Sequence, residues 1–177
     1  MERYIAMLRG INVSGQKIIK MEHLRAMFDA MKYKNVVSYI QSGNVLFDTK
    51  ETDEAELVQK IGKQIFKTYG WEVPTFVRTI PQMQTIIKNN PFKKIIPPEA
   101  VQPYVTFLHS EPTKEQKTML EALSCDTDTF AIKGREVYTL LYKDKGKPLF
   151  TNMFLEKKLK MPGTGRNWLT VNKLIEL

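Results

Sequence analysis

Cysteine and histidine are scarce in this chain, whose 177 residues include one cysteine, Cys125, and two histidines, His23 and His109. A single cysteine excludes an internal disulfide and is typical of proteins in a reducing compartment, so we expect a cytoplasmic location. The three residues show none of the spacings of zinc sites, and we expect neither a metal nor a cofactor. Cys125 follows a predicted helix, away from other candidate ligands, so we expect no catalytic thiolate there.

Long apolar stretches and catalytic motifs are also absent. No apolar run approaches the ~18 residues of a membrane-spanning helix, and the N-terminal residues lack a signal-peptide pattern, so we expect no membrane partner. The segment Gly10-x4-Gly15-Gln16-Lys17 departs from an ATP-binding P-loop, because its lysine comes one position late and no serine or threonine follows it. Carboxylates cluster only at residues 51–56, where they suit a helix start better than a paired-carboxylate hydrolase.

Positive charge, in contrast, is abundant. The chain carries 27 lysines and arginines against 19 aspartates and glutamates, which gives a net charge of +8. Such an excess favours polyanionic partners, including nucleic acid, nucleotides and phosphorylated metabolites. The alternative is that the lysines, which are scattered rather than consecutive, serve solubility on solvated helix faces.

The first part of the chain shows the βαββαβ order of a ferredoxin-like fold. Apolar periodicity predicts strands at 3–8, 36–41, 44–48 and 73–78, with helices at 21–31 and 53–70. Ser42-Gly43 is a plausible hairpin turn between the second and third strands. Asp53 resembles a helix cap, and Gly70 a helix end. Pro74 lies inside the predicted fourth strand, which places that strand at a sheet edge.

The second part repeats this pattern after a helix and a proline-rich linker at 80–102. We expect strands at 104–109, 129–133 and 136–142, helices at 113–123 and near 154–159, a glycine-rich turn at 162–167, and a last helix that Thr170 caps. The fold class is therefore α+β: two ferredoxin-like (α-β plait) halves with antiparallel sheets, at 1–79 and 103–177, the second with a C-terminal helical extension.

Topology brings several polar loops of the first half to one end of its sheet. In a ferredoxin-like order, the end of the first strand, the hairpin of the second and third strands, and the start of the fourth strand lie together. An arginine fork, side-chain amides and glycines that expose backbone N–H groups suit an anion or a polar planar ligand. The alternative is that these residues only satisfy tight turns. The predicted ligand-binding residues are Arg9, Asn12, Gln41, Ser42 and Asn44.

A second polar segment, residues 162–170, completes the candidate site. Arg166, Asn167 and Trp168 are adjacent in a glycine-rich stretch before a helix, where they can stack on a base and hydrogen-bond to a phosphate. We expect them to close the site formed by the first-half loops. The alternative is that Trp168 fastens the last helix to the core and Arg166 pairs with a carboxylate.

Four motifs together resemble a known family. They are LRGINVSG at 8–15, YIQSGNVLF at 39–47, NPF at 90–92 and TGRNWLTV at 164–171. The sequence resembles the bacterial domain-of-unknown-function family 1697, with Ser14 in place of a second glycine. The resemblance implies two ferredoxin-like halves and no known activity, substrate or cofactor.

The main functional hypothesis is a binding module for a phosphate-bearing ligand, either a nucleotide or nucleic acid, that uses the polar glycine-containing loops. One alternative is an enzyme that acts on a small phosphorylated or amide metabolite; it lacks an evident general base. Another is an interaction protein that forms a homodimer through open sheet edges or through the linker that contains Phe92. An RNA-binding sheet is disfavoured, because the third strand, at 44–48, lacks the aromatic signature of such domains.

Overall fold

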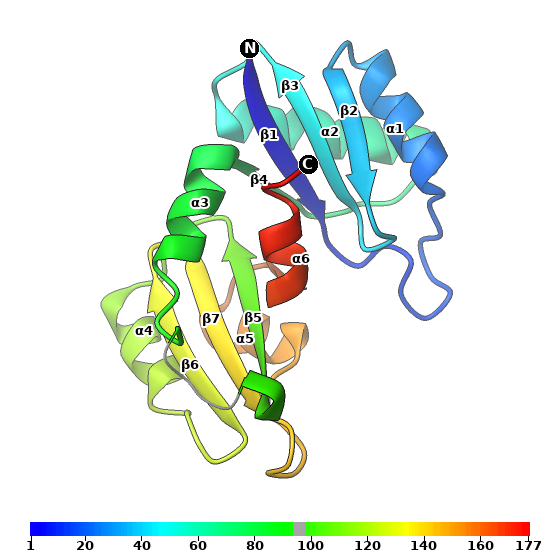
Figure 1. Cartoon of the computed structure of the whole chain (residues 1–177). Helices are drawn as coiled ribbons and strands as arrows, with labels where there is room; N and C mark the ends of the chain where they lie inside the picture. Colours follow the sequence, from blue (N-terminus) through cyan, green and yellow to red (C-terminus); the bar gives the residue numbers. More distant parts are fainter. Residues whose placement is uncertain (94–97) are drawn as a thin grey trace. The chain divides into compact units, whose positions relative to one another are not determined.

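The computed structural model describes residues 1–93 and 98–177, which form two compact units (Figure 1). The first unit comprises Met1–Gln84 with Leu174–Leu177, and the second comprises Thr85–Lys173. Each unit contains a four-stranded antiparallel sheet. Within the described residues, no helix is long and apolar enough to cross a membrane.

The first unit has the predicted βαββαβ order, and the helix that follows, α3, continues past Gln84 into the second unit. The strands of the first unit lie in the order β2-β3-β1-β4, so β3 separates β1 from β2 as a ferredoxin-like sheet requires. The elements are β1 (Glu2–Leu8), α1 (Met21–Ala30), β2 (Lys34–Tyr39), β3 (Asn44–Thr49), α2 (Glu54–Tyr69), β4 (Thr75–Thr79) and α3 (Ile80–Lys88).

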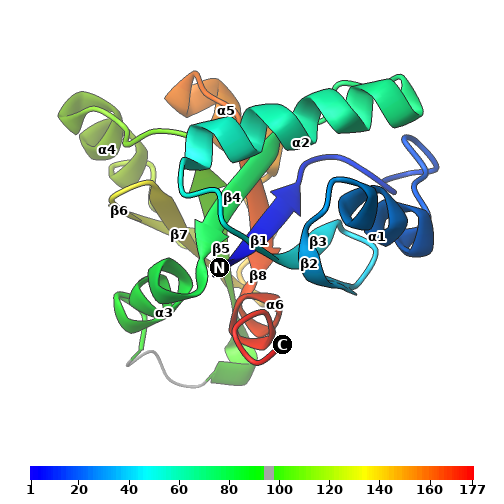
Figure 2. The ribbon, with the colours of Figure 1, turned by 90° about the horizontal axis from the view of Figure 1, so that it is seen from above.

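Helices α1 and α2 cover one face of this sheet (Figure 2). The core between them is centred on Phe47 of β3, whose ring centroid lies 4.5 Å from that of Tyr33 and 5.4 Å from that of Phe28. Leu57, Ile61 and Ile65, which recur at helical spacing along α2, are fully buried in the same core. Helix packing on the sheet therefore follows from the spacing of apolar residues in the sequence.

The boundaries of α2 also match the sequence signals. The carboxylate of Asp53 accepts a hydrogen bond from the backbone N–H of Glu56 (3.1 Å), which satisfies an otherwise unpaired donor of the first turn. The helix ends at Gly70, whose φ of 76° is left-handed and is easily adopted only without a side chain.

The second unit repeats the strand arrangement, with the order β6-β7-β5-β8. The α+β class and the ferredoxin-like arrangement of both sheets agree with the sequence prediction. The elements are the short 3-10 helix η1 (Pro98–Ala100), β5 (Val101–Leu108), α4 (Lys114–Glu121), β6 (Asp128–Lys133), β7 (Glu136–Tyr142), α5 (Asn152–Leu159), β8 (Gly163–Asn167) and α6 (Trp168–Lys173).

A buried carboxylate holds the long connection that precedes α5. Asp128 is fully buried in β6, and its two oxygens accept hydrogen bonds from the backbone N–H groups of Leu149 (2.9 Å) and Phe150 (2.8 Å). The side chain of Thr127 donates a further bond to Asp128. Three donors on one carboxylate offset the cost of burying its charge.

Strand β8 corrects the sequence prediction, which assigned its residues to a glycine-rich turn. Gly163 permits a close approach to β5, because a Cβ on this residue would lie 2.9 Å from Cγ2 of Thr106 and 3.0 Å from Cδ2 of Leu108. Glycine inside a strand often marks such a contact. Because the same residue is common in turns, the sequence pattern alone predicted the wrong element.

Prolines shift two further strand boundaries from their predicted positions. The fourth strand begins at Thr75, so Pro74 precedes this edge strand rather than lying inside it. Strand β5 begins at Val101 and includes Pro103. That proline is tolerated because β8 pairs with β5 only from Tyr104 onwards, so Pro103 has no ladder partner in β8.

The start of the last helix was also predicted wrongly. Helix α6 begins at Trp168, and the cap is Asn167 rather than Thr170. The side-chain oxygen of Asn167 accepts a hydrogen bond from the backbone N–H of Thr170 (2.8 Å). Asparagine and threonine are both good caps, so the sequence did not discriminate between the two positions.

Candidate functional site

The polar loops of the first unit meet at one end of its sheet, as the topology predicted. The backbone N–H of Leu8 donates to the carbonyl of Gly43 (2.8 Å), which joins the end of β1 to the β2–β3 hairpin. The N–H of Arg9 donates to the carbonyl of Pro74 (3.0 Å), which joins the same strand end to the start of β4. The five predicted site residues of this unit belong to these converging segments.

The amide of Asn12 satisfies the backbone of its own loop. Its Nδ2 donates to the carbonyl oxygens of Ile19 (3.0 Å) and Gln41 (2.8 Å), and its Oδ1 accepts from the N–H of Ile19 (2.8 Å). The residue has a φ of 55°, a left-handed conformation that asparagine tolerates better than most residues. Asn12 thus closes the 12–19 loop and ties it to the hairpin.

Asn44 has a comparable structural role at the start of β3. Its side chain is fully buried, and its Nδ2 donates to the carbonyl of Tyr39 (3.0 Å) and to Oγ of Ser42 (2.9 Å). These bonds close the hairpin around Gly43. Gln41 remains exposed, and Arg9 and Ser42 are half-buried. That these residues bind a ligand stays a prediction.

Arg166 lies in β8 of the second unit and is almost completely buried. It donates to Oγ1 of Thr164 (2.7 Å) and to the carbonyl of Gly165 (2.9 Å). Desolvation by burial lowers the pKa of Arg166 to about 10, so the guanidinium remains charged at neutral pH. The three predicted residues at 166–168 belong to the second unit. That they form one binding site with the first-unit loops stays a prediction.

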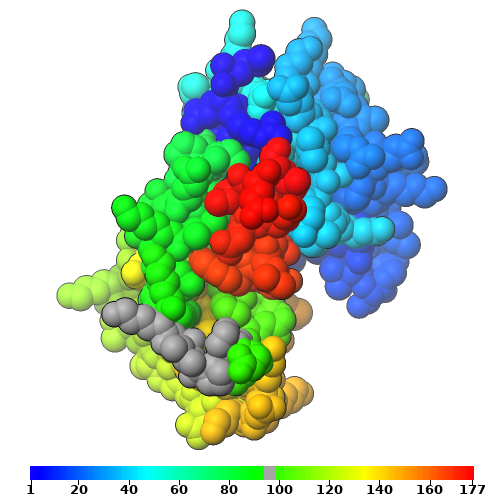
Figure 3. All heavy atoms as spheres, in the orientation of Figure 1, coloured from blue at the N-terminus to red at the C-terminus, as the bar shows by residue number. Residues whose placement is uncertain are grey.

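A pocket of about 640 Å³ in the second unit contains two of the predicted residues, Asn167 and Trp168. Its walls come from four segments: the residues after α3, the start of β5, the end of β7, and the β8–α6 junction. The lining residues are Asn90, Phe92, Lys93, Val101, Gln102, Pro103, Leu140, Lys143, Asn167, Trp168 and Leu169. Figure 3 shows the face of this unit on which the residues after α3 and the start of α6 lie.

The pocket combines flat apolar surfaces with polar groups. Phe92 and Trp168 are half-buried aromatic side chains that contribute to its wall. Asn90 is oriented by a hydrogen bond from the backbone N–H of Phe92 to its Oδ1 (2.9 Å). No acidic side chain is present among the described lining residues. The pocket is therefore suited to a planar ligand that also carries negative charge.

Two lysines supply the positive charge of this pocket. The ammonium of Lys143 donates to the carbonyl of Glu99 (2.9 Å), and that of Lys93 donates to the carbonyl of Lys88. Both bonds are to neutral backbone oxygens, and a phosphate oxygen is a stronger acceptor for the same ammonium groups. Each lysine can therefore exchange a backbone contact for an anionic ligand.

Sequence reasoning missed most of this pocket. Phe92 belongs to the NPF motif of the family resemblance, which was the available signal for it. Gln102 and Lys143 are ordinary surface residues in the sequence, and only the pairing of β5 with β7 brings them together. Their contribution to a site depends on tertiary structure alone.

The described residues offer no metal site, and their one cysteine lies outside the pocket. Across residues 1–93 and 98–177, no three histidine, cysteine, aspartate or glutamate side chains form a group that could hold a metal ion. Cys125 is exposed, and hydrogen bonds from Thr127 and from nearby backbone lower the pKa of its thiol. It stands apart from the residues that line the pocket.

Comparisons with known proteins support the fold and a family relationship. A family model described as "Protein of unknown function (DUF1697)" matches residues 1–138, which include the motifs at 8–15, 39–47 and 90–92. No curated protein matches the chain. A solved structure, that of the conserved bacterial protein SP0830 from Streptococcus pneumoniae, superposes with a TM-score of 0.73 over 99% of this chain and 97% of that one. The two sequences are 21% identical, so this likeness concerns the fold.

Proposed function

Since the chain belongs to the DUF1697 family, whose function is unknown, we propose from the geometry of its second unit that it is a binding module for a nucleotide-like small molecule. The observation that carries this proposal is the pocket that brings Phe92 and Trp168 together with lysines and side-chain amides. Its volume of about 640 Å³ lies within the range of roughly 300–1,000 Å³ that is usual for small-ligand sites.

Each part of a nucleotide has a matching surface in the pocket. The aromatic faces of Phe92 and Trp168 can stack on a base, an interaction of about 1–3 kcal/mol. The amides of Asn90 and Gln102 can hydrogen-bond to the base edge or to ribose hydroxyls. Lys143 can neutralise the phosphate. Binding is favoured over catalysis because the described lining residues include no histidine, cysteine or carboxylate that could act as a general base.

The proposal is tested by titrating AMP against the fluorescence of Trp168 in a Trp71→Phe variant, in which Trp168 is the single remaining tryptophan. We expect AMP to quench this signal at lower concentration than adenosine or inorganic phosphate. The reason is that only AMP uses both the aromatic wall and the lysines. If AMP, adenosine and phosphate all leave the signal unchanged, the proposal is wrong.

Two variants identify the site. Phe92→Ala removes one stacking surface, and Lys143→Gln removes a charged donor worth about 1.5–3 kcal/mol, so each should weaken AMP binding about tenfold or more. Lys147→Gln is the matched control, because Lys147 is exposed in the same unit and does not line the pocket. Equal affinities for the Lys143 and Lys147 variants would show that binding occurs elsewhere.

A further inference from the structure

The first unit contains a second hollow, which differs in chemistry from the pocket of the second unit. It has a volume of about 730 Å³, and six of its thirteen lining residues are lysines. We call it the lysine hollow, after the six lysines in its wall: Lys32, Lys34, Lys50, Lys60, Lys63 and Lys67. None of the residues predicted from the sequence as ligand-binding lines it.

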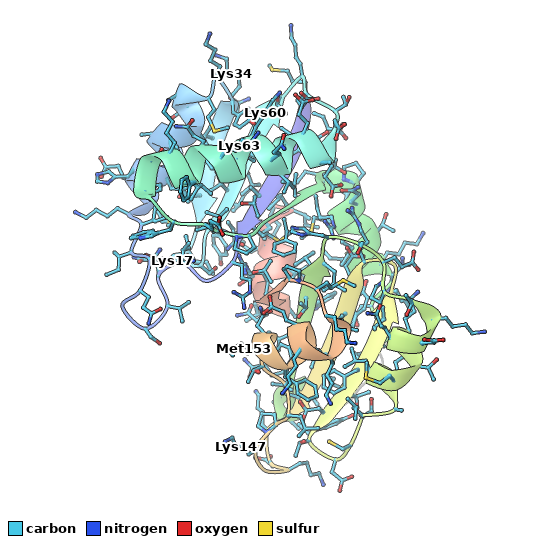
Figure 4. The ribbon with its side chains drawn as sticks, turned by 180° about the vertical axis from the view of Figure 1, so that it is seen from behind. Lys17, Lys34, Lys60, Lys63, Lys147 and Met153 are labelled. Carbon is cyan, nitrogen blue, oxygen red and sulfur yellow. The ribbon has the colours of Figure 1, made fainter. Side chains whose placement is uncertain are left out.

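The lysines come from two sides. Lys60, Lys63 and Lys67 lie three and four residues apart on α2, so they occupy one helix face, along about 10 Å of its length. Lys32 and Lys34 come from the connection between α1 and β2 and from the start of β2, and Lys50 follows β3. Figure 4 shows Lys34, Lys60 and Lys63 gathered beside α2.

Two carboxylates, Asp48 and Glu51, also line the hollow, but each is already engaged by other groups, and Glu51 and the nearby Glu56 contact only Lys60 among the six lysines. Asp48 accepts hydrogen bonds from Arg3 (2.8 Å) and Asn35 (2.6 Å). Glu51 pairs with Lys60 (3.0 Å), which also contacts Glu56 (2.6 Å).

No carboxylate pairs with the other five lysines of the hollow in the described residues. Several like charges therefore surround one concave surface. Their ammonium groups repel one another when the hollow holds only water and salt.

The side chains also indicate the kind of anion. A lysine ammonium is a compact point charge with no planar fork, which suits tetrahedral phosphate oxygens in several orientations. The aromatic residue of the wall, Tyr33, is buried in the helix-covered core and offers no exposed face on which a base could stack. The charges also converge on a bounded volume rather than following a long stripe, as a nucleic-acid backbone would require.

We propose that the lysine hollow binds a small molecule that carries several phosphate groups, such as a linear oligophosphate. This site is independent of the nucleotide pocket of the second unit, and it goes beyond the function proposed above. Because the ligand relieves the repulsion among the lysines, its binding also stabilises the first unit against unfolding.

Calorimetric titration with sodium tripolyphosphate at low ionic strength tests this proposal. The wild-type protein should bind tripolyphosphate, and a Lys63→Gln/Lys67→Gln double variant should bind it at least tenfold more weakly. The control is a Lys147→Gln/Lys157→Gln double variant, which removes the same charge from exposed positions of the second unit and should bind like the wild type. The Lys63/Lys67 variant should also be as stable as the wild type or more stable, since repulsion is reduced.

Three results would overturn the proposal: no binding of tripolyphosphate by the wild type, equal losses in the two double variants, or tighter binding of a 12-nucleotide single strand than of tripolyphosphate at the same hollow. The last result would mean a nucleic-acid surface. Phe92→Ala separates the two sites, because it should weaken AMP binding and leave tripolyphosphate binding unchanged.

Discussion

Replacing Gly43 with alanine should destabilise the first unit strongly, because this glycine permits the hairpin and the loop after β1 to meet. Its φ of +81° is left-handed, which costs a residue with a side chain roughly 1–2 kcal/mol. In addition, a Cβ at this position would lie 2.9 Å from Cβ of Leu8 and 2.7 Å from Cδ1 of Ile11.

The contact with Leu8 cannot relax easily. Its Cβ is attached to a backbone whose N–H donates to the carbonyl of Gly43 itself (2.8 Å), so separating the two atoms strains that bond. Overpacking of this kind costs about 1–3 kcal/mol. When the cost of the left-handed backbone is added, the Gly43→Ala substitution should lower the free energy of unfolding by roughly 2–5 kcal/mol.

Gly10→Ala provides the matched control. Gly10 has a similar φ of +72°, but a Cβ there would meet nothing within 4 Å. This variant should therefore lose only the backbone contribution of about 1–2 kcal/mol. The difference between the two variants isolates the close approach of the two loops.

Urea unfolding measures both effects. Trp71 packs against the core of the first unit, so its fluorescence in a Trp168→Phe background reports that unit. With a denaturant slope of about 1–3 kcal/mol per molar, Gly43→Ala should lower the midpoint by on the order of 1 M. Equal midpoints for the Gly43 and Gly10 variants would refute the steric argument.

Two further predictions concern carboxylates. Asp128→Ala should destabilise the second unit by about 3 kcal/mol and speed amide hydrogen exchange at residues 149–150, because two backbone donors lose a charged acceptor; unchanged exchange would contradict this role. Burial acts to raise the pKa of Asp48, but hydrogen bonds from Asn35 and Arg3 outweigh it and hold the pKa below its ordinary value. The stability that Asp48 contributes is therefore present above pH ~4 and is lost as the pH falls through the folded-state pKa. Asp48→Asn should flatten the dependence of the urea midpoint on pH between about 5 and 3, and an unaltered profile would oppose this assignment.

The candidate site was predictable only in part. The convergence of the first-unit loops followed from strand order, because antiparallel topology places those loops at one sheet end. The pocket of the second unit did not follow, because its wall combines residues as distant in sequence as Phe92, Lys143 and Trp168. Nothing local distinguishes Lys143 from the other exposed lysines of its segment.

The sequence by itself determined the order of elements in the first sheet, three of the four strands of the second sheet, and the family to which the chain belongs. Apolar periodicity, the Asp53 cap and the Gly70 helix end act over a few residues, so they can be recognised without knowing the fold. The role of a polar side chain, in contrast, cannot be recognised from such local signals, because it depends on which groups come within hydrogen-bond distance after folding. Only the tertiary structure decided that the amides of Asn12 and Asn44 satisfy neighbouring backbone, and that lysines from α2, β2 and the end of β3 surround one hollow.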